Sequence, residues 1–155
     1  MATVKLSQSR AVPVPLEEAF DRVLTHPLPE VFSRRSVAIP AIKDVRGNSG
    51  SWGSVGQSRT IVLADGGTML ETLTAVVRPT SFGYTITNVT GAMKPLVSTA
   101  VGRWSFEAAG TGTRITWTWE LTPTPVGRFA MPVFGAMWNG YARKALERIE
   151  QILLG

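Results

Sequence analysis

Apolar and polar residues alternate with a period of two along most of the chain between residues 37 and 122. The stretch "GTGTRITWTWEL" shows the pattern clearly, because Ile115, Trp117, Trp119 and Leu121 fall on one face and polar residues on the other. Alternation of this kind is typical of a half-buried strand. We therefore predict a strand at 112–122 and five more, at 37–46, 57–64, 67–78, 82–90 and 98–108.

Turn residues separate these strands. "ADGG" at 64–67 and "AAGTGT" at 108–113 supply the glycine and aspartate that tolerate the positive φ of hairpin turns, and "RPTS" provides another break. Short connections between successive strands indicate an antiparallel meander. A further strand is predicted at 3–12, where Pro13 and Pro15 end it.

The period becomes helical in two places. "PLEEAFDRVLT" predicts a short helix whose N-terminus Glu17 and Glu18 favour, and "HPLPEVFSRR" predicts one more short turn or helix. After "LTPTPVGRFAMP", apolar residues recur every three or four positions through Ile152, which predicts one long helix. It begins near Pro132, or near Pro125 with a kink at Pro132.

The order strand, two short helices, six-stranded meander and long helix resembles the START and pollen-allergen-like superfamily, also called SRPBCC, of the polyketide cyclase/dehydrase and lipid transport type. The matching segments are "AVPVPLEEAFDRV", "GSVGQSRTIVLADGGTMLET", "FGYTIT" and "GRWSFEAAGTGTRITWTWEL". The resemblance implies an α+β helix-grip fold, in which a curled sheet wraps around the terminal helix and leaves an elongated apolar cavity. It also implies binding of lipids, sterols, polyketides or other hydrophobic molecules, and in some members cyclisation or dehydration.

Several large side chains fall on the face predicted to point inward. They are either plain core or the walls of a cavity. On the helix, Asn139 has an intermediate angle and faces either the cavity or solvent. The candidate ligand-binding residues are Trp104, Phe106, Trp117, Trp119, Tyr84, Met69, Met137, Trp138 and Asn139.

The hairpin around "DGG" places a carboxylate among apolar neighbours. Alternation turns Met69, Glu71, Leu73 and Ala75 inward. With a loop at 65–67, Arg59 lies opposite Leu73 and is a diagonal neighbour of Glu71 on the same face. The two residues form a structural ion pair, or Glu71 acts as an acid or base whose charge state Arg59 sets. Glu71 and Arg59 are therefore the candidate catalytic residues if the protein is an enzyme.

Two other residues have a structural and a functional interpretation. His26, in "THPLP", is expected to be exposed and inactive, with a role as acid or base at the cavity mouth as the alternative. Trp52, in the glycine-rich segment "GNSGSWGSVG", is a candidate lid. One histidine, no cysteine and no tight carboxylate cluster argue against a metal site, and we expect no cofactor.

Composition limits the class of protein. With 155 residues, 44% apolar and 17% charged, the chain is expected to fold as one globular domain over 1–155. The net charge of +5 is spread over small groups such as Arg34 and Arg35, so no nucleic-acid partner is expected. The chain shows no signal peptide and no membrane-spanning run, which favours a cytoplasmic location. The pattern makes no prediction about the oligomeric state.

Three functions remain open in this order. The first is binding or carriage of a hydrophobic small molecule in the cavity. The second is a polyketide cyclase or dehydratase activity, in which Glu71, Arg59 or Tyr84 moves protons and confinement accelerates the reaction. The third is a basic interaction module that docks to RNA or to a membrane, for which binding would depend steeply on salt.

Overall fold

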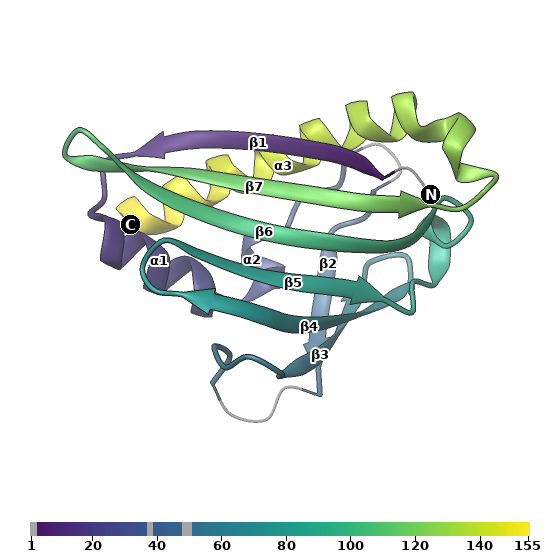
Figure 1. Cartoon of the computed structure of the whole chain (residues 1–155), viewed down its shortest axis with the longest axis horizontal. Helices are drawn as coiled ribbons and strands as arrows, with labels where there is room; N and C mark the ends of the chain where they lie inside the picture. Colours follow the sequence, from purple (N-terminus) through teal and green to yellow (C-terminus); the bar gives the residue numbers. More distant parts are fainter. Residues whose placement is uncertain (1–2, 37–38, 48–50) are drawn as a thin grey trace.

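A seven-stranded antiparallel sheet forms the framework of the computed structural model, which describes residues 3–36, 39–47 and 51–155 (Figure 1). The strand order is β1-β7-β6-β5-β4-β3-β2, so β2 to β7 are a meander and β1 joins its far edge. The strands are β1 (Val4–Val12), β2 (Ile42–Arg46), β3 (Ser58–Leu63), β4 (Thr68–Val77), β5 (Ser81–Thr87), β6 (Val97–Ala109) and β7 (Gly112–Pro123). The predicted meander is confirmed, but its first strand begins at Ile42 instead of residue 37, and residues 37–38 lie outside the described part.

The helices occupy the predicted places. Between β1 and β2 lie α1 (Leu16–Thr25) and the single turn α2 (Leu28–Val31). The C-terminal helix α3 (Met131–Leu154) begins one residue before Pro132, and a 3₁₀ turn η2 (Gly127–Ala130) precedes it. A second 3₁₀ turn, η1 (Gly91–Met93), lies between β5 and β6. Proline within the first turn of a helix leaves no intrahelical hydrogen bond unmade, so Pro132 does not interrupt α3.

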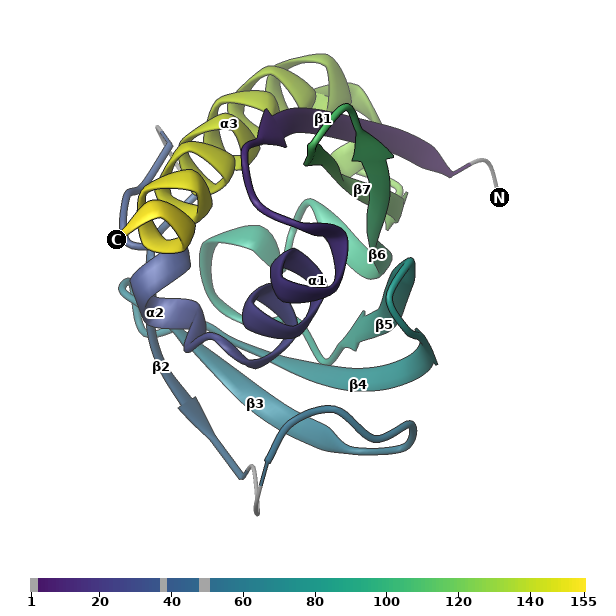
Figure 2. The same cartoon turned by 90° about the vertical axis from the view of Figure 1, so that its left-hand side faces the viewer.

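The sheet curls around α3 in the helix-grip arrangement. Figure 2 shows the strands as an arc from β1 to β2, with α3 along the open side, α1 inside the arc and α2 between α3 and β2. An ion pair of 2.9 Å between Arg10 Nη2 on β1 and Glu150 Oε1 on α3 links the sheet edge to the helix. The sheet and the helix thereby enclose one apolar interior, which is where the candidate site lies.

The alternation of buried residues follows the predicted faces on β7. Ile115, Trp117, Trp119 and Leu121 are all buried. On β4 the prediction fails at Ala75, which is exposed. Leu73 pairs with Tyr84 and Ala75 with the preceding residue of β5, so Thr74 is the extra residue of a β-bulge. A bulge of one residue reverses the alternation beyond it, which is why Ala75 faces outward.

Candidate ligand-binding cavity

The interior contains a cavity of about 60 Å³ between the concave face of the sheet, α2 and α3. One water molecule needs roughly 10 to 15 Å³ of such space, so the cavity has room for about four to six. Its walls are mainly aliphatic and aromatic. They are formed by Val23, Leu24, Leu28, Val31, Phe32, Ile39, Pro40, Ile42, Arg59, Ile61, Leu63, Met69, Glu71, Phe82, Tyr84, Ile86, Met93, Trp104, Trp117, Trp119, Phe134, Trp138, Tyr141 and Ile149.

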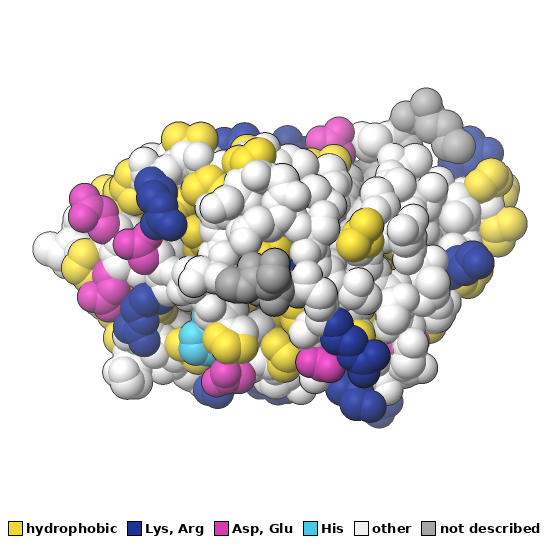
Figure 3. Space-filling model, turned by 90° about the horizontal axis from the view of Figure 1, so that it is seen from below, with side chains coloured by type: hydrophobic (Ala, Val, Ile, Leu, Met, Phe, Trp, Pro, Cys, Tyr) yellow, Lys and Arg dark blue, Asp and Glu magenta, His cyan; other side chains and the backbone are white. Residues whose placement is uncertain are grey.

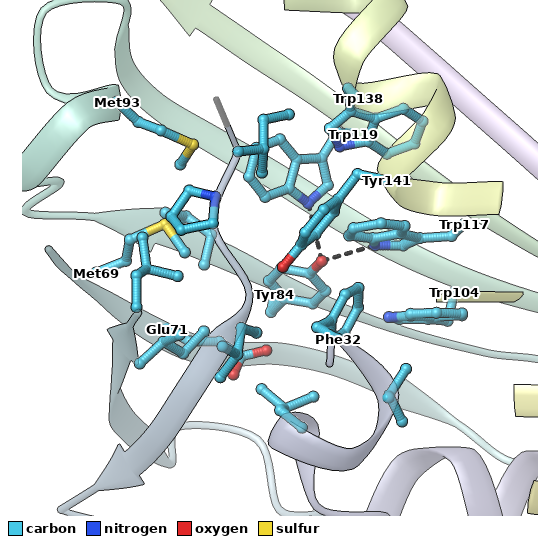
Figure 4. A pocket seen from close by; sticks show the side chains of 18 of the residues that line it. Phe32, Met69, Glu71, Tyr84, Met93, Trp104, Trp117, Trp119, Trp138 and Tyr141 are labelled. Atoms are coloured by element: carbon cyan, nitrogen blue, oxygen red, sulfur yellow. Dashed lines mark hydrogen bonds between the residues drawn. The ribbon is translucent and has the colours of Figure 1, made fainter. Parts of the chain in front are cut away.

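A hydrogen-bonded aromatic triad forms one wall. The Nε1–H groups of Trp117 and Trp119 both donate to the hydroxyl oxygen of Tyr84, over 2.8 and 3.0 Å (Figure 4). Tyr84 on β5 reaches the indoles on β7 because Gly102 lies between them on β6. A Cβ at Gly102 would stand 2.0 Å from Cζ of Tyr84. The glycine therefore leaves the space that the phenol occupies, which explains a glycine in the interior of a strand.

Trp117 is also the centre of an aromatic stack. Its ring lies parallel to that of Trp104, with centroids 5.3 Å apart, and contacts Trp138 of α3 at 4.8 Å. Phe32, which follows α2, packs on Trp117 at 5.1 Å and on Tyr141 at 5.5 Å. Offset and tilted contacts at these distances are favourable beyond the area that they bury. Trp117 is thus held on three sides and forms a rigid part of the cavity wall.

Arg59 and Glu71 form a buried ion pair that also faces the cavity. The distance between Arg59 Nε and Glu71 Oε1 is 2.6 Å, and both side chains are more than nine-tenths buried. The two residues lie directly opposite on β3 and β4. The predicted register is therefore wrong by two residues, because the loop comprises residues 64–66 instead of 65–67. A shift of two residues keeps every side chain on its face, so the predicted neighbours still meet.

Each member of this pair also interacts with its surroundings. Burial raises the pKa of the Glu71 carboxyl, and the charge and hydrogen bond of Arg59 oppose that shift. The guanidinium of Arg59 stacks on the ring of Trp52, 3.8 Å from its centroid. Trp52 is buried there and is not among the residues that line the cavity. The prediction that the Trp52 side chain forms a lid is therefore wrong. Residues 48–50 of the same segment lie outside the described residues.

Two tyrosines supply hydroxyl groups to the cavity. Burial, followed by the negative charge of Glu71, raises the pKa of Tyr84. Burial raises the pKa of Tyr141 as well, and Tyr84 adds to that shift. Figure 4 shows the hydroxyl of Tyr141, on α3, directed toward the hydroxyl of Tyr84. Both phenols therefore remain neutral over the ordinary pH range, so each hydroxyl keeps a proton that it can donate.

Three predicted site residues do not line the cavity. Phe106 is buried but packs on Phe20 of α1, at 5.3 Å, because α1 covers this end of β6. Met137 and Asn139 are half-buried, and they lie to either side of the cavity-facing stripe of α3 that contains Trp138. The other predicted residues, Trp104, Trp117, Trp119, Tyr84, Met69, Trp138, Glu71 and Arg59, do line it.

Other lining residues were not predicted to be part of the site. Tyr141 belongs to the apolar stripe of the terminal helix, so the helical period contained the signal. Phe32 and Met93 come from short irregular segments next to α2 and at η1, where no period indicates a direction. Gly102 does not line the cavity but makes room for Tyr84, and it is detectable only as a glycine within a predicted strand.

His26 and the surface add little to the site. The His26 side chain is partly buried, with Nε2 3.6 Å from Oε1 of Glu30, and does not line this cavity. Within the described residues no cluster of three potential metal ligands occurs, and no helix there has the length and apolarity needed to span a bilayer. Figure 3 shows the Lys and Arg side chains of one face in separate groups, without a continuous basic patch on that face.

The fold and the cavity define a helix-grip protein with an aromatic-walled internal pocket. In sequence, residues 3–153 match the family model described as "Polyketide cyclase / dehydrase and lipid transport", and the chain belongs to this family. The predicted family resemblance is thereby confirmed. A comparison with curated proteins finds no match.

Solved structures share the fold at low sequence identity. Ginseng major latex-like protein 151 from Panax ginseng is 14% identical, with a TM-score of 0.72 and full coverage of both chains. A protein from Thermus thermophilus is 15% identical, with a TM-score of 0.70 and 97% of each chain covered. Ara h 8.0201 is 20% identical, with a TM-score of 0.66 and 99% of each chain covered. At these identities the likeness concerns the fold alone.

Proposed function

We propose that this protein binds a hydrophobic small molecule in the cavity between the sheet and α3. The observation that carries the proposal is the cavity itself, whose walls are almost entirely aliphatic and aromatic. An apolar pocket with a few convergent polar groups is the usual form of a small-molecule site. The family description, which includes lipid transport, is consistent with this function.

The rigid aromatic wall supports binding over simple core packing. Tyr84, Trp117 and Trp119 are fixed to one another by hydrogen bonds, so they do not collapse into the space beside them. A space that is already partly formed reduces the reorganisation that a ligand requires, which favours binding.

Two measurements test the proposal. Native mass spectrometry of protein purified from its own source, followed by solvent extraction, is expected to detect a co-purified hydrophobic compound. Calorimetric titration with indane, a neutral bicyclic hydrocarbon, tests binding directly. The variant Met69→Trp fills the cavity from β4 and is expected to abolish indane binding, because Met69 lines the cavity.

The matched control is Leu70→Trp. Leu70 is the next residue on β4 and points to the opposite face of the sheet. The Leu70→Trp variant adds the same bulky ring outside the cavity, so indane binding should persist. Equal binding by wild type and Met69→Trp would show that the ligand does not occupy this cavity.

A second candidate function is acid–base catalysis in the same cavity. The observation that favours it is Glu71, a buried carboxyl group whose pKa burial raises and that lines the cavity. Such a group suits proton transfer to or from a bound ligand. If a cyclisation or dehydration is found, Glu71→Gln should lower turnover by about 10²- to 10⁴-fold. A Gln variant with nearly full turnover would assign the reaction to confinement alone.

A further inference from the structure

We propose that the ligand is a compact, uncharged ring compound that carries a hydrogen-bond acceptor, such as a carbonyl oxygen, placed between the hydroxyls of Tyr84 and Tyr141. This inference rests on the proposed binding function and specifies the chemistry of the ligand. It follows from an imbalance between hydrogen-bond donors and acceptors on the cavity wall.

The proton of Tyr84 has no acceptor among the residues described. Indole N–H groups only donate, so the hydroxyl oxygen of Tyr84 is the acceptor in both of its hydrogen bonds, to Trp117 and Trp119. The phenol proton must then point elsewhere. Because the oxygen already accepts two hydrogen bonds, cooperativity strengthens the donor that remains.

Tyr141 supplies a second donor at the same place. Its hydroxyl makes no hydrogen bond to the described part of the chain, although the side chain is largely buried. It lies toward the Tyr84 hydroxyl, from the opposite side of the cavity (Figure 4). A hydroxyl proton that faces an apolar cavity without an acceptor loses a favourable interaction, so both hydroxyls gain from a ligand that accepts hydrogen bonds.

The remaining polar groups add donors rather than acceptors. The Nε1 atom of Trp138 is buried without a partner in the described residues. Arg59 uses only Nε in its bond to Glu71, and its terminal nitrogens make no hydrogen bond to the residues that the structure describes. The acceptors among these lining side chains are the Glu71 carboxylate, of which Arg59 occupies one oxygen, and the hydroxyl oxygen of Tyr141.

Charge and size restrict the ligand further. Arg59 and Glu71 compensate one another, so the cavity offers no net charge to balance an ionic ligand, and an unpaired charge is strongly disfavoured in an apolar interior. The volume of about 60 Å³ is smaller than the roughly 150 Å³ of an engineered cavity that binds benzene, so even a small ring compound requires the walls to move, and an extended acyl chain fits less well still.

The test compares two ligands of nearly the same shape, indane and 1-indanone, which differ by one carbonyl oxygen. Both are titrated calorimetrically into wild type, Tyr141→Phe and Tyr84→Phe. Tyr141→Phe is the cleaner variant, since it removes a hydroxyl that makes no hydrogen bond within the described part of the chain. We expect each variant to weaken the binding of 1-indanone by about 3- to 10-fold, which corresponds to the loss of one neutral hydrogen bond. The affinity for indane should change by less than about twofold.

The outcomes separate the two proposals. If both ligands bind wild type and 1-indanone binds the tyrosine variants equally well, the acceptor site is wrong and the hydrophobic binding function stands. If neither ligand binds wild type, the binding function fails and this inference fails with it.

Two charged analogues test the assignment of an uncharged ligand. 1-Aminoindane and indane-1-carboxylate, which are charged at pH 7, should bind at least 10-fold more weakly than 1-indanone. Tighter binding of either would overturn the assignment of an uncharged ligand.

Discussion

At Gly102 on β6, the absence of a side chain allows the Tyr84 phenol to cross from β5 to the indoles of β7. Gly102→Ala would place a methyl group 2.0 Å from Cζ of Tyr84, well inside contact distance, so the phenol must move. The indole N–H groups of Trp117 and Trp119 then lose their acceptor inside the protein. We expect a loss of about 2 to 4 kcal/mol in the free energy of unfolding, measured by urea denaturation.

Gly83→Ala is the matched control on the neighbouring strand. A Cβ at Gly83 would meet its nearest atom at 3.5 Å, an ordinary contact. Alanine also restricts the unfolded chain more than glycine, so stability should stay equal or rise slightly. Equal destabilisation by both substitutions would mean that the effect comes from the strand backbone and not from the Tyr84 phenol.

The two buried phenols give the protein an alkaline limit. Folding raises the pKa of Tyr84 and Tyr141, while in the unfolded chain a tyrosine ionises near its ordinary pKa of about 10. The contribution of the two phenols to the free energy of unfolding is complete below that pH. It is lost as the pH rises toward the higher pKa values of the folded state, because only the unfolded state then releases the protons. The free energy of unfolding should therefore fall above about pH 10, by up to about 1.4 kcal/mol per pH unit for each phenol.

Tyr141→Phe isolates one phenol from the other groups that titrate in this range. Urea denaturation at pH 8, 10 and 11 should give a shallower decline for this variant than for wild type. Identical slopes would mean that the Tyr141 hydroxyl is not shielded from solvent.

At the scale of elements, the contact between β3 and β4 depends on a charge pair inside the sheet. Removing one partner leaves the other buried without compensation, so Arg59→Met and Glu71→Leu should each cost about 3 to 5 kcal/mol. The double variant should recover most of that loss, because an apolar pair of similar volume replaces a buried ion pair well. A double-mutant cycle by urea denaturation measures the coupling.

The Arg10–Glu150 pair between β1 and α3 is the matched control. Its side chains are 39% and 27% exposed, so solvent screens the interaction, and the coupling should be about 1 kcal/mol or less. A coupling between Arg59 and Glu71 that is as weak as this one would show that water reaches the cavity pair.

Alternation was sufficient to predict the faces of the strands but not their details. It assigned Trp104, Trp117, Trp119 and Tyr84 to the interior because a side-chain period of two survives any error of register by two residues. It did not detect the bulge at Thr74, since a bulge depends on both strands. The close approach of Tyr84 to Gly102 was equally invisible, because it joins distant positions of the sequence on neighbouring strands.

The cavity residues of the helix and of the irregular segments were harder to predict from the sequence than those of the strands. Residues on either side of a helical stripe differ by small rotations, so Met137 and Asn139 were assigned to a cavity that Tyr141 lines instead. Phe32 and Met93 reach the cavity from segments without a period. Sequence reasoning predicted the wall formed by the sheet and missed much of the wall formed by α2, η1 and α3.

For the whole molecule, binding in the cavity should appear as thermal stabilisation. A ligand that binds only the folded state adds about 2.7 kcal/mol at a concentration 100-fold above its Kd. For a chain of 155 residues this corresponds to a rise in Tm of about 5 to 11 °C. Differential scanning calorimetry with 1-indanone should show the rise in wild type and in Leu70→Trp. A rise of the same size in Met69→Trp would point to a site on the surface.

The distribution of tryptophans makes the protein its own optical reporter. Four of the five tryptophans, Trp104, Trp117, Trp119 and Trp138, line the cavity, and the fifth, Trp52, packs on Arg59. Almost all intrinsic fluorescence therefore originates at or beside the site, without background from indoles elsewhere. The emission wavelength and intensity should respond to any molecule that enters, so unlabelled protein can be screened against compound collections in a plate reader.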